Sequence, residues 1–188
     1  MTSVLGGTTS LSHLALRRAH DLALPIELAL LFNSLELLDL AENSIISTLP
    51  AQLGFLTGLL TLDFTRNVIF GPVPTYLGFL TKLDTLSLFS NAVSGPISSE
   101  LELLTELEVF NLGNNNLIGN LSTGLGLWTK LEALSLFDSL IPGTIPTELA
   151  QLTLLKQLYL DGMNLQGILP AAICSIVTLE DLWGDCED

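Results

Sequence analysis

The chain has 188 residues, of which 48% are hydrophobic, so it can bury a continuous core without a metal or a cofactor to stabilise it. Six lysines and arginines stand against 20 acidic residues, which gives a formal net charge of −14. This charge argues against nucleic-acid binding, because binding to phosphates requires Lys and Arg to neutralise them. It also disfavours binding to anionic membrane surfaces, and it leaves cationic or neutral partners open.

No segment reads as a signal peptide or a membrane span. The N-terminal stretch "MTSVLGGTTSLSHLALRR" lacks a basic region ahead of an apolar one. Residues 109–129 are uncharged but include five Asn and four Gly, and residues 43–62 are interrupted by Pro50 and Gln52. Neither stretch is the near-continuous apolar run that a spanning helix needs, so we expect no membrane span in this chain.

A 24-residue phrase repeats through most of the chain. It combines a segment such as "LDTLSLFSN", a loop such as "AVSGPIS" and an apolar segment such as "TYLGFLTK". A fixed period of this length predicts a solenoid, because one unit cannot bury its leucines alone and neighbouring coils must stack. The phrase recurs without slippage from evenly spaced leucines: Leu35, Leu59, Leu83, Leu107, Leu131, Leu155 and Leu179.

These repeats resemble the plant-type leucine-rich-repeat family, whose pattern is LxxLxLxxNxLxGxIPxxLGxLxx, from about Leu35 to Leu182. The resemblance implies an α/β repeat solenoid: a right-handed superhelix with a parallel concave sheet and 3-10 or irregular convex turns. It also implies a protein- or peptide-binding function, as in receptor-like kinase ectodomains and polygalacturonase-inhibitor-like proteins. An extracellular or cell-surface location follows from the resemblance, while the lack of a signal peptide leaves a cytoplasmic location open.

The frame divides the chain into four expected parts. Residues 1–10 form an N-terminal extension, and residues 11–34 form a degenerate first repeat that covers the open end of the core. Residues 35–178 hold six repeats, and residues 179–188 begin a truncated seventh repeat or cap. The chain shows no kinase motif, so signalling would require segments outside it.

A column of asparagines is expected to be structural. Each ends a strand where the chain turns inward, and one amide side chain can satisfy both donors and acceptors of a buried turn. Ser139 and Met163 take the next two places, so we expect the ladder to fail in the last coils, which should be locally weaker. The asparagines of this column are Asn43, Asn67, Asn91 and Asn115.

The concave face offers the candidate binding residues. Phe89 and Phe137 should flank a gap of about 10 Å, two coil spacings wide, with Gly113 as its floor. Exposed aromatic residues near a polar rim are common anchors of protein interfaces, although aromatic residues also favour strands for other reasons. The predicted partner-binding residues are Phe89, Phe137, Tyr159, Asp138, Asp161, Trp183, Asp63 and Arg66.

An enzyme is not expected. The chain has two histidines, His13 and His20, and no phosphate-binding loop, HExxH motif or clustered metal ligands, so we predict no catalytic residue, cofactor or metal. Asp39 and Asp63 occupy equivalent positions in adjacent strands, roughly 5–7 Å apart. That spacing would suit a glycosidase pair or a cation, but two solvated carboxylates on an exposed strand are the favoured interpretation.

Two sites of covalent modification remain open. Cysteine-bearing C-terminal caps occur in extracellular members of the family that the chain resembles. Cys174 falls on the convex return, however, and Cys186 falls at a strand end. Free cysteines, or a partner cysteine missing from this chain, are therefore favoured over an internal disulfide. Asn120 opens the single N-glycosylation sequon, in a loop where a glycan would fit.

A second interpretation of the function remains possible besides ligand recognition. The protein would then be a structural or self-assembling repeat without a specific ligand, held by lateral or end-to-end contacts. Trp128 is expected to pack in the core, and the acidic run 98–108 to form a solvated face. The oligomeric state does not follow from the sequence.

Overall fold

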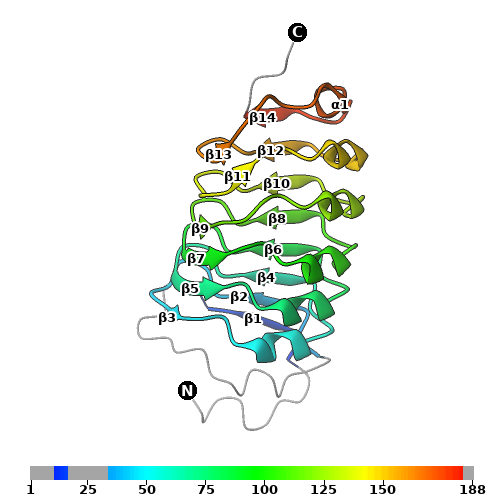
Figure 1. Cartoon of the computed structure of the whole chain (residues 1–188). Coiled ribbons are helices and arrows are strands. Elements are labelled where there is room, and N and C mark those ends of the chain that lie inside the picture. The colour runs from blue at the N-terminus through cyan, green and yellow to red at the C-terminus, as the bar shows by residue number, and fades with distance from the viewer. Residues whose placement is uncertain (1–10, 17–33, 184–188) are drawn as a thin grey trace.

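A computed structural model describes residues 11–16 and 34–183, which form one stack of coils (Figure 1). Each coil adds one strand to an eight-stranded parallel sheet, in the order β1-β2-β4-β6-β8-β10-β12-β14. We call the outer face of this sheet the concave face. The strands are β1 (His13–Ala15), β2 (Leu37–Asp39), β4 (Thr61–Asp63), β6 (Thr85–Ser87), β8 (Val109–Asn111), β10 (Ala133–Ser135), β12 (Gln157–Tyr159) and β14 (Asp181–Trp183).

The sheet keeps the register of the sequence repeat throughout. Leu38 pairs with Leu62, and Leu62 pairs with Leu86, so equivalent residues of successive coils lie directly side by side. Because side chains alternate between the two faces of a strand, each position of the repeat becomes a straight column on one face. The predicted solenoid with a parallel sheet is confirmed.

A second set of short strands lies on the flank of the stack, where the sequence predicted loops. The four-stranded part contains β3 (Ile46–Ser47), β5 (Val68–Pro72), β7 (Ala92–Gly95) and β9 (Asn116–Leu117), and the two-stranded part contains β11 (Pro142–Gly143) and β13 (Asn164–Leu165). Stacking brings these segments into pairing distance, so ladders form although each segment is only two to five residues long.

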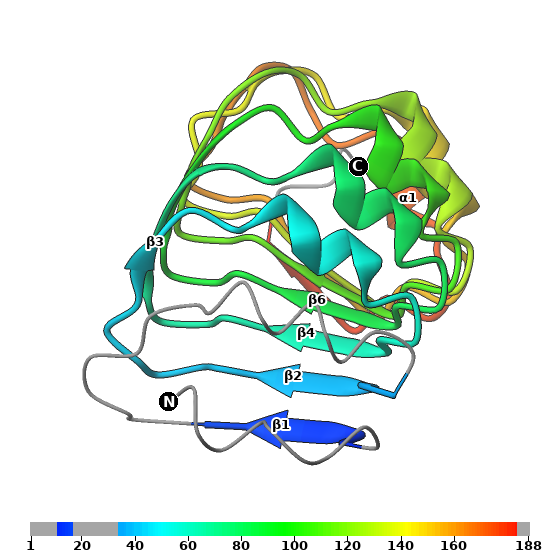
Figure 2. The same ribbon diagram turned by 90° about the horizontal axis from the view of Figure 1, so that it is seen from below.

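From residue 34 on, the opposite side of each coil returns through a short helix (Figure 2). In this described range five are 3-10 helices, as expected for the convex turns, and the last is a single α-helical turn. They are η2 (Ala51–Phe55), η3 (Thr75–Phe79), η4 (Ser99–Leu103), η5 (Thr123–Leu127), η6 (Thr147–Gln151) and α1 (Ala171–Cys174).

Close stacking of the five 3-10 helices places a glycine on one side of each contact between them. A Cβ atom on Gly54 would clash with the carbonyl oxygen of Tyr76 in the next coil. Glu102 occupies the position equivalent to Gly54, two coils on. At this contact the glycine belongs to the following helix, and the Glu102 carboxylate lies against Gly124. The Glu102 side chain is also held by the Ser122 hydroxyl, which donates to Oε1 at 2.6 Å.

One apolar core runs through all the described coils, built chiefly from the repeat leucines. Trp128 is completely buried in it, with its ring centroid 4.6 Å from that of Phe110 and its Nε1 donating to the Leu101 carbonyl at 3.2 Å. Trp128 is therefore a core residue.

The asparagine column forms a continuous ladder of hydrogen bonds. Asn67 is typical: its Nδ2 donates to the carbonyls of Phe64 in its own coil and Leu40 in the coil before, and its Oδ1 accepts from the Ile45 N–H. The amides of Asn43, Asn91 and Asn115 likewise donate to carbonyls of two successive coils. The ladder therefore ties each of these coils to its neighbour at turns that are partly or fully buried, where the backbone groups need partners from the chain itself.

Ser139 interrupts this pattern. Its side chain is only 2% exposed, and its hydroxyl has no hydrogen-bond partner. A serine is too short to span from one coil to the next as the asparagines do.

The C-terminal coil contains a disulfide-bonded cysteine, Cys174. This differs from the free thiol or missing partner that was favoured from the sequence over an internal bridge; Cys186 lies outside the described residues. Within the described ranges, no helix is long and apolar enough to cross a bilayer. The four-part division of the chain stays a prediction, because its boundary regions are only partly described.

We predict that Ser139→Asn stabilises the protein. The longer amide should extend the ladder by one coil, and each added hydrogen bond contributes about 0.5–1.5 kcal/mol to the free energy of unfolding. Urea unfolding should show a higher midpoint with an unchanged slope. Asn115→Ser is the matched control and should lower the midpoint; an unchanged or lower midpoint for Ser139→Asn would show that the coil has no room for the amide.

Candidate functional site on the concave face

The concave face carries the side chains that the core does not use. The residues on either side of the central apolar residue of each strand point away from the core, so two columns leave every strand. The predicted binding residues lie in the column after this central residue and at the loop positions that follow it. The column before it was not predicted to contribute; it runs His13, Leu37, Thr61, Thr85, Val109, Ala133, Gln157 and Asp181.

Asp39 and Asp63 lie opposite each other in β2 and β4, as expected from the repeat. Each carboxylate accepts a hydrogen bond from the backbone N–H two residues on: from Ala41 at 3.0 Å and from Thr65 at 2.7 Å. Both aspartates therefore help to shape the turn at the end of their strands. In the described part of the chain, no group of three or more His, Cys, Asp and Glu is placed to hold a metal ion, and His20 lies outside that part.

Three of the predicted binding residues meet in an open hollow over the first coils. Asp63, Arg66 and Phe89 line it together with Ala41, Glu42 and Thr65, and its volume is about 180 Å³. This is smaller than the ~300–1,000 Å³ typical of small-molecule pockets. The hollow combines both charges with one aromatic wall, which suits a side chain of a larger partner better than an entire small ligand.

Phe89 also forms a ring pair with Phe137. The ring centroids are 5.7 Å apart and the planes are tilted by 42°. The predicted open gap between these rings, two coil spacings wide, is therefore wrong. The physical reason is Gly113, which has no side chain to keep the rings apart: a Cβ there would lie 2.8 Å from Cδ1 of Phe137.

The C-terminal part of the concave face holds a polar cluster centred on Asp181. Its carboxylate accepts hydrogen bonds from Gln157 Nε2 at 3.2 Å and from the Tyr159 hydroxyl at 3.3 Å. Burial, followed by the negative charge of Asp181 and the hydrogen bond to it, raises the pKa of Tyr159. The backbone of Trp183 pairs opposite Tyr159 in β14, but its side chain lies outside what the structure describes.

Asp138 and Asp161 occupy the exposed turns that follow Phe137 and Tyr159. The Asp138 N–H donates to the Asp161 carbonyl at 2.9 Å, which joins the two turns. Asp138 has a φ of 50°, and its carboxylate lies against Gly162. Asn120 of the sequon is exposed, in the segment between β9 and η5.

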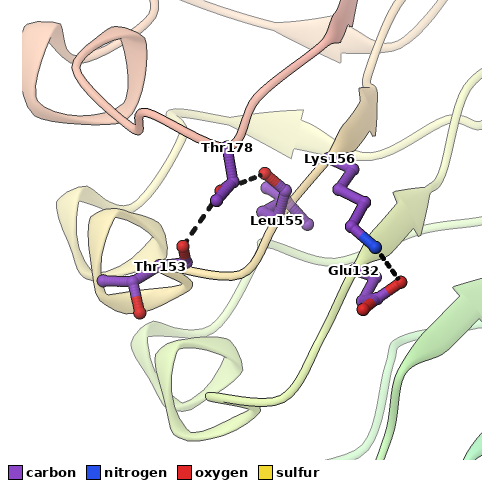
Figure 3. A network of polar contacts seen from close by, with 5 residues as sticks. All are labelled: Glu132, Thr153, Leu155, Lys156 and Thr178. Carbon is purple, nitrogen blue, oxygen red and sulfur yellow. Dashed lines mark hydrogen bonds and ion pairs between the residues drawn. The ribbon is translucent and has the colours of Figure 1, made fainter.

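Ion pairs between coils line the edge of the sheet where the strands begin. Lys156 Nζ lies 2.7 Å from Glu132 Oε2 in the preceding coil, and this hydrogen bond raises the pKa of Lys156 (Figure 3). Nearby, the Thr178 hydroxyl contacts the carbonyls of Thr153 and Leu155 at 2.9 and 2.8 Å. The last coil is thus tied to its neighbour by polar contacts.

The described surface is predominantly anionic. Lys130 pairs with Glu106 at 2.5 Å in the same way as Lys156 pairs with Glu132. Exposed pairs of this kind contribute only about 0–1 kcal/mol to stability, but they neutralise two of the few cations in a chain with 20 acidic residues. The excess of carboxylates over cations favours a cationic partner.

The convex side carries an exposed apolar row that was not predicted from the sequence. Phe55, Phe79, Leu103 and Leu127 end four successive 3-10 helices, and each side chain is 53–54% exposed. The rings of Tyr76 and Phe79 pack edge to face with centroids 5.9 Å apart. The signal was present in "LGFLT", "LELLT" and "LGLWT", where an apolar residue precedes the buried one.

Comparison with known proteins agrees with the fold and the repeat pattern. The Leucine Rich Repeat family model matches residues 34–56. No curated protein sequence matches the chain significantly.

Solved structures similar to the chain include plant receptors. The plant peptide hormone receptor RGFR1 in complex with RGF2 is 31% identical, with a TM-score of 0.80 over 85% of this chain and 26% of the receptor chain. The Arabidopsis receptor kinase HAESA in complex with the peptide hormone IDA and the co-receptor SERK1 is 31% identical, with a TM-score of 0.82 over 90% of this chain and 29% of that one.

A third similar structure is the leucine-rich-repeat ectodomain of the plant membrane receptor kinase GASSHO1/SCHENGEN3 from Arabidopsis thaliana, in complex with CASPARIAN STRIP INTEGRITY FACTOR 2. It is 31% identical, with a TM-score of 0.81 over 85% of this chain and 19% of that one. The chain thus spans less than a third of the length of each of these three receptor chains. With its evenly stacked coils, its asparagine ladder and its likeness to these structures, the protein is a leucine-rich-repeat solenoid similar to part of the ectodomains of plant receptor kinases.

Proposed function

We propose that this chain is a recognition module that binds an extended peptide or protein segment across its concave face. The observation that carries the proposal is the continuous strip of non-core side chains on that face. It runs from the hollow beside Arg66, over the ring pair of Phe89 and Phe137, to the polar cluster of Tyr159 and Asp181. Exposed aromatic rings flanked by polar groups are typical anchors of protein interfaces.

The similar structures support this function and its location. The peptide hormone receptor RGFR1 was solved with RGF2, HAESA with the peptide hormone IDA, and the GASSHO1/SCHENGEN3 ectodomain with CASPARIAN STRIP INTEGRITY FACTOR 2. By analogy, this module would work outside the cell, within a receptor-like protein or as a secreted inhibitor. The sequon at Asn120 would then be a glycosylation site. The net charge of −14 favours ligands with basic residues.

The concave face supports binding better than catalysis. Its two adjacent aspartates are engaged with backbone N–H groups of their own turns. The hollow over the first coils is open and small, so it would not enclose a substrate. We therefore expect the concave face to bind and release its ligand without altering it chemically.

We predict that peptides selected from a displayed library of short random sequences will bind through this strip. Phe89→Ala with Phe137→Ala should weaken their affinity at least tenfold, which is about 1.4 kcal/mol, because truncating aromatic anchors typically has effects of this size. Isothermal titration calorimetry with synthetic versions of the selected peptides would measure it.

The convex face supplies a matched control for this experiment. Phe55→Ala with Phe79→Ala removes two rings of the same type from the other side of the molecule and should leave the affinity unchanged. Loss of binding in the convex variant, with full binding in the concave one, would contradict the proposal.

The apolar convex row favours a second candidate function, self-assembly. Phe79 and Leu103 lie in the middle of this row, and side chains of this size that are 54% exposed gain free energy from mutual burial. Under this function, the chain would form oligomers through convex contacts without a ligand.

We predict that, if the row drives association, the protein will sediment as an oligomer at micromolar concentration. Phe79→Glu with Leu103→Glu should convert it to a monomer, because the new charges would be buried in the contact. Sedimentation velocity over a dilution series measures this. A wild-type chain that is monomeric at every concentration would exclude the second function.

A further inference from the structure

We infer that Phe89 and Phe137 close a slot that accepts one apolar side chain of an extended peptide, and that the Ser135 hydroxyl in the slot hydrogen-bonds to a carbonyl of the peptide backbone. The inference rests on the proposed function and deepens it, since it assigns a subsite and a chemical class of ligand. Phe89 follows β6 and Phe137 follows β10, and these strands lie on either side of β8 in the sheet (Figure 1). Gly113, which follows β8, is the floor of the slot.

The first observation is a hydroxyl group without a partner. Ser87 and Ser135 occupy the same position in the repeat, two coils apart. The Ser87 hydroxyl lies 2.7 Å from the hydroxyl of Thr65 in the preceding coil. For Ser135 the equivalent position is Gly113, so no such partner exists; its hydroxyl is buried and unsatisfied, and the residue is 5% exposed.

The second observation concerns the space beside Gly113, where other residues of the repeat have a side chain. The Phe137 ring lies over Gly113, with Cδ1 and Cε1 both 2.8 Å from where a Cβ would be, and Ser135 Oγ is 3.0 Å from that point. An aromatic ring thus covers a polar atom and offers it no hydrogen bond. Buried polar groups are normally paired, and an unpaired one destabilises the closed arrangement.

The ring pair is able to open. Phe89 and Phe137 are both only partly buried and belong to the sheet surface, and neither is part of the core cluster. Rotation about χ1 moves such a ring between staggered positions without disturbing the backbone. With the rings upright, two coil spacings separate them by about 10 Å.

The width of the open slot selects its occupant. A group in contact with both rings needs about 7–8 Å, which is twice the ~3.5–4.0 Å contact distance between carbon atoms. One apolar side chain fills that space. A peptide backbone also offers a carbonyl to the Ser135 hydroxyl, and the exposed Asp138 carboxylate after Phe137 would face a neighbouring basic residue. The ligand class is therefore an extended peptide with an apolar residue next to a basic one.

Ser135→Ala tests the hydroxyl, and its two expected effects have opposite directions. Removing an unsatisfied buried hydroxyl should leave the melting temperature of the free protein unchanged or raise it. The affinity for the peptides selected on the wild-type chain should fall about tenfold. Ser87→Ala is the matched control: it breaks the hydrogen bond to Thr65, so it should lower the melting temperature and leave the affinity unchanged.

Gly113→Thr tests the slot itself. The new side chain would fill the space and supply Ser135 with the hydroxyl partner that Thr65 gives Ser87. Affinity should fall at least tenfold for the selected peptides. A second measurement uses the wild-type chain and peptides in which the apolar residue is replaced by glycine. Their affinity should fall by the same factor. Ser135→Ala remains decisive if Gly113→Thr does not fold.

The outcomes separate this inference from the proposed function. In one outcome, the selected peptides lose affinity for Phe89→Ala/Phe137→Ala but bind Ser135→Ala and Gly113→Thr as tightly as the wild type. This result would overturn the slot and leave recognition by the concave face standing. A library that yields no peptide dependent on the concave face would overturn both.

Discussion

The structure depends on one constraint: no coil can bury its leucines without a neighbour on each side. Stacking is therefore obligatory, and its spacing of about 4.8 Å between strands applies to every other feature. The core leucines, the asparagine ladder and the flank strands all recur at this spacing. The concave face is built from residues that the stacking leaves free, so its chemistry can vary from coil to coil without loss of the fold. This separation of roles is what makes a repeat protein suited to recognition.

The sequence was sufficient to predict the fold, because the signal for it is repeated. Each coil supplies the same leucine spacing independently, and six copies outweigh the irregularities of any one. The flank strands were missed because a segment such as Ile46–Ser47 is too short to show a period; only its neighbours make it a strand. Cys174 was misjudged for a similar reason, since pairing depends on a distance between segments that spacing alone does not determine.

The concave site was predictable in its columns but not in its contacts. Phe89 and Phe137 lie on the predicted face, yet sequence spacing describes where side chains start and not how far they lean. Their approach to 5.7 Å follows from a residue that has no side chain, Gly113. The hydrogen bonds of Asp181 to Gln157 and Tyr159 were likewise missed, because the column that contains Gln157 and Asp181 was not considered. Contacts between columns are properties of the stack.

The glycine contacts between the convex helices restrict how such a protein can gain or lose repeats. Most junctions place the glycine first, as Gly54 does against Tyr76, but the junction at Glu102 reverses the order and relies on Gly124. Removal of the one repeat that contains Gly124 would bring Glu102 against Glu148, with no glycine on either side. Copy number is therefore free to change at some junctions and not at others. The coils resemble one another in sequence, but they are not interchangeable parts.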